Sequence, residues 1–274
     1  MNTPQQPLAF IGGGNMASAI IGGLIRQGMP ATQITVVEPF AETASRLKRD
    51  FGVAVLPEAG PGLNTAQLVV WAVKPQVFKE AAGPVANYTR QALHLSVAAG
   101  IRTESIGHWL GTDRVVRSMP NTPALVGQGM TALFACPGVS QAEKKQVEQV
   151  IATTGQFLWV AQESHLDAVT ALSGSGPAYV FFFLEAMTEA GVGMGLSAEQ
   201  AYRLAVATFA GASSLAAASQ EPPEVLRQRV TSKGGTTHAA ITSMEAAGIK
   251  PAFVQAMQAA EQRARELGDE FGKA

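Results

Sequence analysis

Three consecutive glycines directly after a short apolar segment restrict how this chain can fold. The segment Leu8-Ala9-Phe10-Ile11 predicts a buried parallel strand, and a helix-like stretch extends from Ala17 to Gln27. The turn between them consists of Gly12, Gly13, Gly14, Asn15, Met16 and Ala17. This order matches the G-x-G-x-x-A fingerprint, whose glycines permit a tight turn and close approach to a pyrophosphate at a helix N-terminus. A purely structural glycine turn is the alternative.

An acidic residue after a second apolar segment supports the dinucleotide interpretation. Residues 34–37 predict a strand, and Glu38 follows it, about 20 residues beyond the fingerprint, where a carboxylate accepts hydrogen bonds from a ribose diol. Together the two segments predict a βαβ unit that binds NAD or NADP.

Short apolar runs alternate with helical stretches up to about Glu163, and the strand signal then ends. Further strands are expected at residues 53–56, 68–73, 92–97, 114–117, 130–134 and 157–160. Helices are expected at residues 165–172, 177–191, 198–219, 222–230, 238–247 and 252–271. The pattern predicts an α/β fold, with an N-terminal Rossmann-type doubly wound parallel sheet over residues 1–164 and a C-terminal all-α domain over residues 165–274.

Ligands of such a sheet gather at the carboxyl ends of its strands. Besides the glycine turn and Glu38, the cofactor-binding residues expected there are Ala72, Val73, Lys74, Pro75, Ala98, Ala99, Gly100 and Asn121. Lys74 either helps to bind the cofactor or is a solvated lysine at a strand end. Asn121 either donates its amide to the nicotinamide region or closes a turn.

A second glycine-rich turn, residues 230–240, lies far along the chain and leads into a helical stretch. The amides and the positive dipole end of a helix start suit a carboxylate or a phosphate, and Gly234 and Gly235 allow a close approach. Thr236 and Thr237 can cap this helix and offer hydroxyl donors to the same anion. A simple helix cap is the alternative.

Composition excludes several classes of protein. A net charge of −1 with 15% charged residues leaves no basic stripe for nucleic acid. The apolar stretch 178–184 is too short to span a membrane, the polar N-terminus lacks a signal-peptide pattern, and we expect a soluble, cytoplasmic protein. The lone cysteine, Cys136, excludes a disulfide framework. No metal site is expected, because the histidines are scattered at His94, His108, His165 and His238.

Five motifs occur in an order and spacing that resemble the pyrroline-5-carboxylate reductase family over roughly residues 7–270. They are Phe-Ile-Gly-Gly-Gly-Asn-Met-Ala, Ala-Val-Lys-Pro, Asn-Thr-Pro, Leu-Ser-Gly-Ser-Gly-Pro-Ala-Tyr and Val-Thr-Ser-Lys-Gly-Gly-Thr-Thr. The resemblance implies a reductase that converts 1-pyrroline-5-carboxylate, a small imino acid, to L-proline with NAD(P)H. It also implies a homo-oligomer, either a dimer or a ring of dimers.

The resemblance further implies roles for individual residues. Thr236 and Thr237 would hold the substrate carboxylate, with Ser232 lining the same turn, while Thr170 and Ser175 would line the pocket from the other helix start. The main task of the protein would be to orient the cofactor and the imine.

Two other functions compete with this one. A β-hydroxyacid-type dehydrogenase needs a lysine on a helix of its second domain, and residues 178–217 contain none. A non-catalytic nucleotide sensor would not need a second anion-binding turn.

The sequence departs from the family pattern where the cofactor ribose is expected. Many similar proteins carry serine, asparagine or arginine after the second strand, whereas this chain has Glu38-Pro39-Phe40 and no basic residue before Arg46. A carboxylate repels a 2′-phosphate, so we expect NADH to serve at least comparably with NADPH. Arg46 or Lys48, on the following helix, could partly offset Glu38.

Overall fold

The computed structural model describes residues 6–272, which divide into two compact units. One contains the residues up to Ser175 together with the segment from Ala260, and the other is Gly176–Ala259. The change from sheet to helix falls near residue 164, between β8 (Gly155–Trp159) and α6 (His165–Val169). The first unit nevertheless extends beyond this point, because α6 packs against β6 (Val115–Met119) and β7 (Gly129–Ala135) and buries Leu166.

The first unit is built on one eight-stranded sheet with the order β3-β2-β1-β4-β5-β6-β7-β8. Its period-two pattern sends alternate residues to opposite faces, so that Leu8 and Phe10 enter one apolar core while Ala9 and Ile11 enter the other. The other strands are β2 (Ile34–Val37), β3 (Ala54–Leu56), β4 (Leu68–Trp71), β5 (Leu93–Ser96), β6 (Val115–Met119) and β7 (Gly129–Ala135), and β1 is Leu8–Ile11.

The sheet is parallel, as the alternating pattern predicts, except at one position. Strand β7 pairs with β6 in the antiparallel direction, with Val116 opposite Ala135, while all the other neighbours are parallel. A parallel crossover needs a dozen or more residues, usually including an α-helix. Residues 120–128 contain only the short helix η3 (Thr122–Val126), so the chain turns back.

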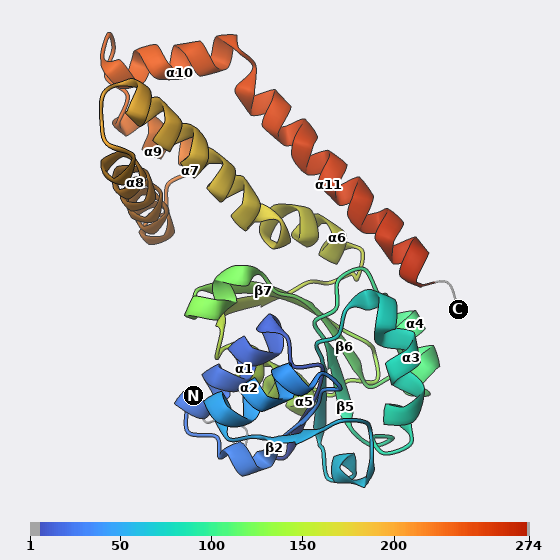
Figure 1. Cartoon of the computed structure of the whole chain (residues 1–274). Coiled ribbons are helices and arrows are strands. Elements are labelled where there is room, and N and C mark those ends of the chain that lie inside the picture. Colours follow the sequence, from blue (N-terminus) through green and yellow to red (C-terminus); the bar gives the residue numbers. More distant parts are fainter. Residues whose placement is uncertain (1–5, 273–274) are drawn as a thin grey trace. The chain divides into compact units, whose positions relative to one another are not determined.

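Helices cover both faces of the sheet (Figure 1). One face packs against α1 (Asn15–Arg26), α2 (Ala41–Phe51) and α5 (Gln141–Ile151), and the other packs against α3 (Pro75–Ala86) and α4 (Thr103–Leu110). Two further short helices, η1 (Ala31–Gln33) and η2 (Pro61–Leu63), lie in connections. This doubly wound arrangement brings the carboxyl ends of the parallel strands to one edge of the sheet.

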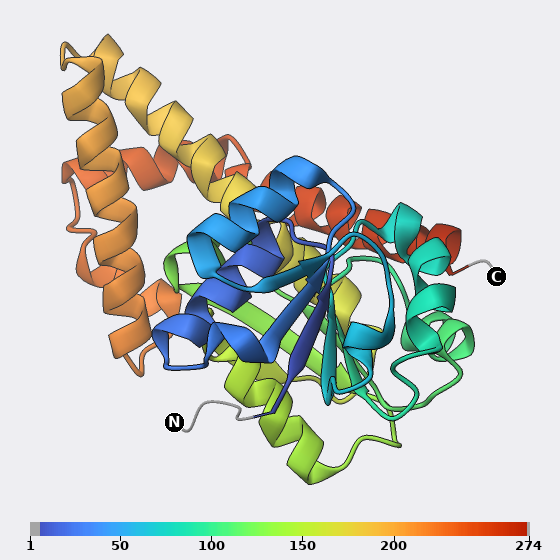
Figure 2. The ribbon, with the colours of Figure 1, turned by 60° about the horizontal axis from the view of Figure 1, so that its bottom comes forward.

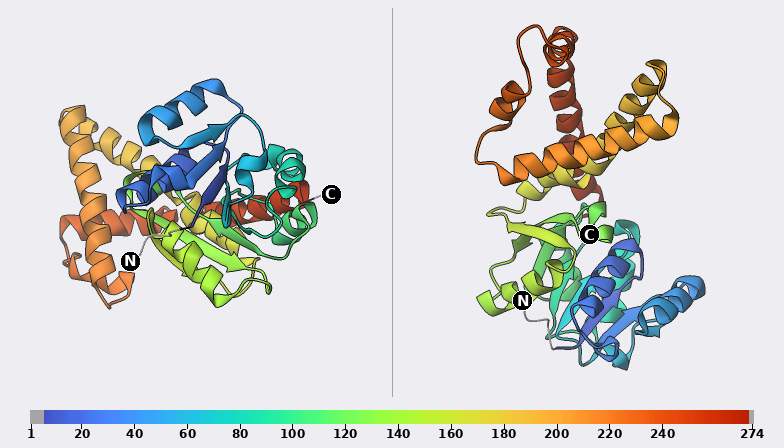
Figure 3. Two further views of the ribbon diagram at one scale, coloured as in Figure 1. Left: turned by 90° about the horizontal axis from the view of Figure 1, so that it is seen from below. Right: turned by 90° about the vertical axis from the view of Figure 1, so that its left-hand side faces the viewer.

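The second unit is entirely helical. It contains α7 (Gly176–Gly193), α8 (Ala198–Ala218), α9 (Pro223–Arg229), α10 (Thr236–Ala246) and the first part of α11 (Ile249–Phe271). Helices α7 and α8 meet at their connecting turn and diverge from it (Figures 2 and 3). The close approach requires Gly191, because a Cβ atom there would lie 2.7 Å from the Cβ of Ala201.

Helix α11 begins at Ile249, three residues before the predicted start at residue 252, so that Pro251 lies in its first turn. Proline is tolerated there because the N–H that it lacks would have no partner within the helix.

Candidate active site

The glycine turn after β1 has the geometry that its sequence predicts. Gly12 has φ +90°, and a Cβ atom on it would lie 2.7 Å from the carbonyl oxygen of Ala72. Nothing lies within 4 Å of the corresponding position on Gly14, so the backbone is open at the start of α1. The turn is therefore tight on its protein side and open where a pyrophosphate would approach.

Glu38 and Arg46 bind the two backbone polar groups of Gly13. The Gly13 backbone N–H donates to Glu38 Oε2 at 2.8 Å, and Arg46 Nη2 donates to the Gly13 carbonyl oxygen at 3.2 Å. The other carboxylate oxygen, Glu38 Oε1, accepts from the Phe40 N–H at 2.9 Å. Glu38 is buried in this position, so the predicted acid does adjoin the glycine turn.

The loop after β4 lies directly against this turn. A Cβ atom on Gly12 would also approach Val73 Cγ1 at 3.0 Å, and Ala72 donates its N–H to the carbonyl oxygen of Ile11. Lys74 has an extended backbone at the N-cap of α3, and Pro75 is the first residue of that helix. The structure thus places Ala72 and Val73 against the fingerprint, and Lys74 and Pro75 follow them at the start of α3.

The loop after β5, Ala98-Ala99-Gly100, has a second neighbour that the sequence does not reveal. Gly100 has φ +77°, and a Cβ atom on it would lie 3.1 Å from Phe271 and 3.3 Å from Leu267, both on α11. Both its positive φ and its packing against α11 favour glycine at this position, independently of any cofactor.

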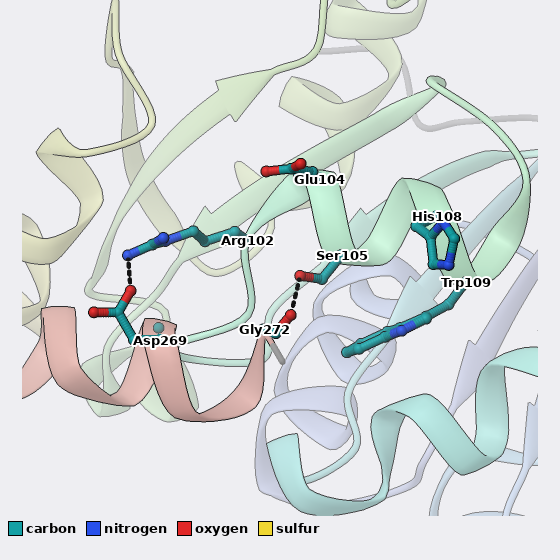
Figure 4. Close-up of a pocket in the computed structure, with 8 residues that line it drawn as sticks. Arg102, Glu104, Ser105, His108, Trp109, Asp269 and Gly272 are labelled. Carbon is teal, nitrogen blue, oxygen red and sulfur yellow. Dashed lines mark hydrogen bonds and ion pairs between the residues drawn. The ribbon is translucent and has the colours of Figure 1, made fainter. Parts of the chain in front are cut away.

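A cavity of about 730 Å³ lies beside this contact, between α4 and the last turns of α11. Arg102 reaches Asp269 at 2.6 Å, and the Ser105 hydroxyl donates to the Gly272 carbonyl oxygen at 3.2 Å (Figure 4). None of the residues that line it belongs to the predicted site.

Asn121, after β6, uses both polar groups of its side chain within the protein. Its Nδ2 donates to the Ser173 carbonyl oxygen at 3.1 Å, and its Oδ1 accepts from the Met130 N–H at 2.9 Å. These contacts support the turn-closing interpretation and join the strand end to the segment Thr170–Gly174.

That segment is a single turn of π-helix, η4 (Thr170–Gly174), between α6 and α7. Thr170 donates its hydroxyl to the Leu166 carbonyl oxygen at 2.7 Å, and the Ser175 N–H donates to the carbonyl oxygen of Thr170. Gly174 packs against the end of the Met119 side chain, since a Cβ atom on it would lie 2.5 Å from the Met119 terminal methyl carbon. Thr170 and Ser175 are therefore held close to the carboxyl end of β6. Such π-turns occur frequently at functional sites.

Sequence reasoning missed a buried ionic cluster beneath this segment. Arg117 on β6, 3% exposed, lies 3.1 Å from Glu163 Oε1 and 3.8 Å from Asp167 Oδ1. Glu163 also accepts from the backbone N–H and the hydroxyl of Thr103. Burial raises the pKa of Asp167 despite the nearby arginines. An arginine directly after two valines in a predicted strand was the available signal, since buried charges require partners.

The second predicted turn lies in the helical unit, and one detail of its interpretation is wrong. Gly235 is the N-cap of α10, and no side chain caps the helix; Thr236 and Thr237 are its first two residues. Within the described residues, neither hydroxyl makes a hydrogen bond. Ser232 lies at the same turn, and a Cβ atom on Gly235 would approach its Oγ at 2.6 Å.

The predicted residues therefore form two groups. The cofactor candidates, with Thr170 and Ser175, belong to the sheet unit, whereas Ser232, Thr236 and Thr237 belong to the helical unit. The open glycine turn fits a dinucleotide, and the uncapped start of α10 fits a carboxylate. No helix among residues 6–272 is long and apolar enough to cross a membrane.

Comparison with known proteins gives consistent matches along the chain. Residues 163–267 match the family model described as pyrroline-5-carboxylate reductase dimerisation, and residues 7–100 match that of NADP oxidoreductase coenzyme F420-dependent. The chain is 45% identical to the pyrroline-5-carboxylate reductase of Pseudomonas aeruginosa, with the whole of both chains covered.

Solved structures agree with these matches. A pyrroline-5-carboxylate reductase from Coxiella burnetii has a TM-score of 0.90 and 37% identity, covering 96% of this chain and 99% of its own. A Plasmodium falciparum pyrroline carboxylate reductase with NADP bound has a TM-score of 0.87 and 27% identity, covering 97% and 100%.

Proposed function

The chain belongs to the pyrroline-5-carboxylate reductase family. From this we propose that the glycine turn after β1 binds the cofactor and that the turn before α10 binds the substrate. The chain is an oxidoreductase that reduces 1-pyrroline-5-carboxylate to L-proline, the last step of proline biosynthesis. The ring nitrogen is basic and is protonated from solvent to an iminium; one hydride from NAD(P)H is then added to the carbon of this C=N⁺ bond, the nitrogen keeps its proton, and NAD(P)H is oxidised to NAD(P)⁺.

The glycine turn and the loop after β4 hold the cofactor, which supplies the hydride when bound. Gly12 allows the turn to pack against Ala72, and the open amides at the start of α1 would hold the pyrophosphate. Glu38, at the end of β2, would accept hydrogen bonds from the adenosine ribose. These residues would anchor the cofactor so that its nicotinamide can deliver the hydride.

The turn before α10 holds the substrate carboxylate. The observation that supports this assignment is that the first amides of α10 have no side-chain cap and that the hydroxyls of Thr236 and Thr237 are unused within residues 6–272. Such donors suit a carboxylate at the positive end of the helix dipole. Ser232 lines the same turn, and Thr170 and Ser175 complete the pocket around the imine.

The chain forms a homo-oligomer, as the match to the dimerisation model indicates. We propose that dimers assemble through the helical unit and gather into a ring, and that each active site takes its helical part from a neighbouring chain. A cytoplasmic location belongs to the same proposal, because a single cysteine suits a reducing compartment.

Oxidation of NADPH and of NADH, followed by absorbance with and without 1-pyrroline-5-carboxylate, tests the proposed reaction. Substrate-dependent oxidation with one mole of proline formed for each mole of cofactor is the expected result. Oxidation that does not depend on the imino acid would contradict the proposal.

A further inference from the structure

We propose that Arg46 is the residue through which this chain accepts the 2′-phosphate of NADPH next to Glu38. The proposal deepens the proposed function, since it assumes that a nicotinamide dinucleotide lies on the glycine turn. It names a residue in the second turn of α2, eight positions after Glu38 in the sequence.

The first step of the argument is the fixed position of Arg46. Its Nη2 donates to the Gly13 carbonyl oxygen at 3.2 Å. The same face of α2 is packed against the turn, because a Cβ atom on Gly13 would meet Leu47 at 2.4 Å and Thr43 at 3.3 Å. The guanidinium is therefore held at the glycine turn.

The second step is that Glu38 cannot move aside for a phosphate. Both its carboxylate oxygens accept backbone N–H groups, from Gly13 and Phe40, and the residue is only 6% exposed. Its carboxylate is therefore fixed at the glycine turn, where the proposed function places the ribose. A 2′-phosphate placed there needs a compensating cation, because like charges at such a distance repel each other.

The third step is the chemistry of the guanidinium group. Arginine has five N–H donors in a planar fork that matches phosphate, and Arg46 uses one nitrogen on Gly13. Lys48, on the same helix, is exposed, and its side chain makes no hydrogen bond or ion pair within residues 6–272. Arg46 is thus the cation that the structure fixes at Gly13, the residue whose N–H donates to Glu38.

The test compares Arg46→Gln with the matched control Lys48→Gln, which removes the same charge from the same helix. Dissociation constants for NADPH and NADH are measured by titration of nucleotide fluorescence. Calorimetry with 2′,5′-ADP and 5′-AMP isolates the 2′-phosphate, because these two probes differ only in that group. Circular dichroism and thermal unfolding confirm that the variants are folded.

We expect Arg46→Gln to raise the Kd for NADPH and for 2′,5′-ADP by about tenfold or more, which is the loss of a charge-assisted hydrogen bond. The Kd values for NADH and 5′-AMP should change by less than about threefold on the same scale. Lys48→Gln should leave all four values close to wild type. An Arg46→Lys variant should restore part of the NADPH affinity.

Equal weakening of NADPH and NADH by Arg46→Gln would overturn the proposal, because it would show that Arg46 only supports the turn. A loss of 2′,5′-ADP affinity in Lys48→Gln as large as in Arg46→Gln would also overturn it. Neither result affects the proposed reaction, which is decided separately by wild-type turnover of the imino acid with either cofactor.

Discussion

At Glu38, one carboxylate serves both the fold and the choice of cofactor. It accepts hydrogen bonds from the N–H groups of Gly13 and Phe40, which fixes the glycine turn, and it carries a negative charge beside the proposed ribose position. A free ribose diol can donate to this group, whereas a phosphate is repelled by it.

Replacing Glu38 with serine should shift the preference toward NADPH. Removal of the charge eliminates a repulsion of about 1–3 kcal/mol, so the ratio of kcat/KM for NADPH to that for NADH should rise roughly five- to a hundredfold. Glu38→Gln, which keeps the size of the side chain, should shift the ratio in the same direction. Steady-state kinetics with both cofactors measures this ratio, and an unchanged ratio in both variants would show that Glu38 does not face the ribose.

Replacing Thr237 with alanine should weaken binding of the imino acid far more than binding of the cofactor. One charge-assisted hydrogen bond to the carboxylate is lost, which corresponds to about 1.5–3 kcal/mol, or roughly ten- to a hundredfold in kcat/KM for the imino acid. Thr242→Ala, in the second turn of the same helix, is the matched control. A wild-type kcat/KM in the Thr237 variant would remove this hydroxyl from the site.

At the scale of elements, strands β4 and β5 are joined by a buried side-chain pair. Trp71 Nε1 donates to His94 Nδ1 at 3.0 Å, and both side chains are almost fully buried. Burial lowers the pKa of His94 to about 4, so the imidazole is neutral in the folded protein at physiological pH.

This pair predicts a loss of stability in acid. An unfolded chain binds a proton at His94 near pH 6.5 and the folded chain only near pH 4, so stability falls as the pH drops between these values. The full pKa difference corresponds to a decrease of about 3 kcal/mol in the free energy of unfolding. Urea unfolding at a fixed protein concentration should show a smaller loss between pH 6.5 and 4.5 for His94→Gln than for wild type. Equal losses would contradict the prediction.

The sequence predicted the elements whose signals are local. The strand–turn–helix around Gly12 and most helices of the second unit have strong periodicity or turn residues, and these were placed within a few residues. Contacts between distant segments have no local signal that identifies the partner, so the ion-pair partners of Arg117, the packing of α11 on Gly100 and the pairing of β7 with β6 emerged only from the fold. At the site, the glycines were predictable from backbone chemistry, whereas the contact of Arg46 with Gly13 was not.

At the scale of the whole molecule, the helical unit has little core of its own. Along α7 and α8 only Leu184, Gly191, Ala201 and Ala205 are buried, while Phe182 is 67% and Leu215 71% exposed. Apolar surface of this extent marks an interaction site. Covering it is the physical reason for the homo-oligomer.

Light scattering at low micromolar concentration should therefore give a mass of at least twice the 28.5 kDa of one chain. Replacing Leu215 with glutamate places a charge in the proposed contact and should reduce both mass and activity. Lys145→Glu, on helix α5 of the sheet unit, is a control that should change neither. A fully active wild-type monomer would contradict the assembly.

The transfer of deuterium from cofactor to product tests the central claim most directly. NADPH and NADH labelled at either face of nicotinamide C4 are incubated with the enzyme and 1-pyrroline-5-carboxylate, and the proline is analysed by mass spectrometry. The account predicts that one of the two labelled faces delivers a single deuterium to C5 of proline, in proportion to the cofactor oxidised. Proline without deuterium from either face, or cofactor oxidation without proline, would contradict it.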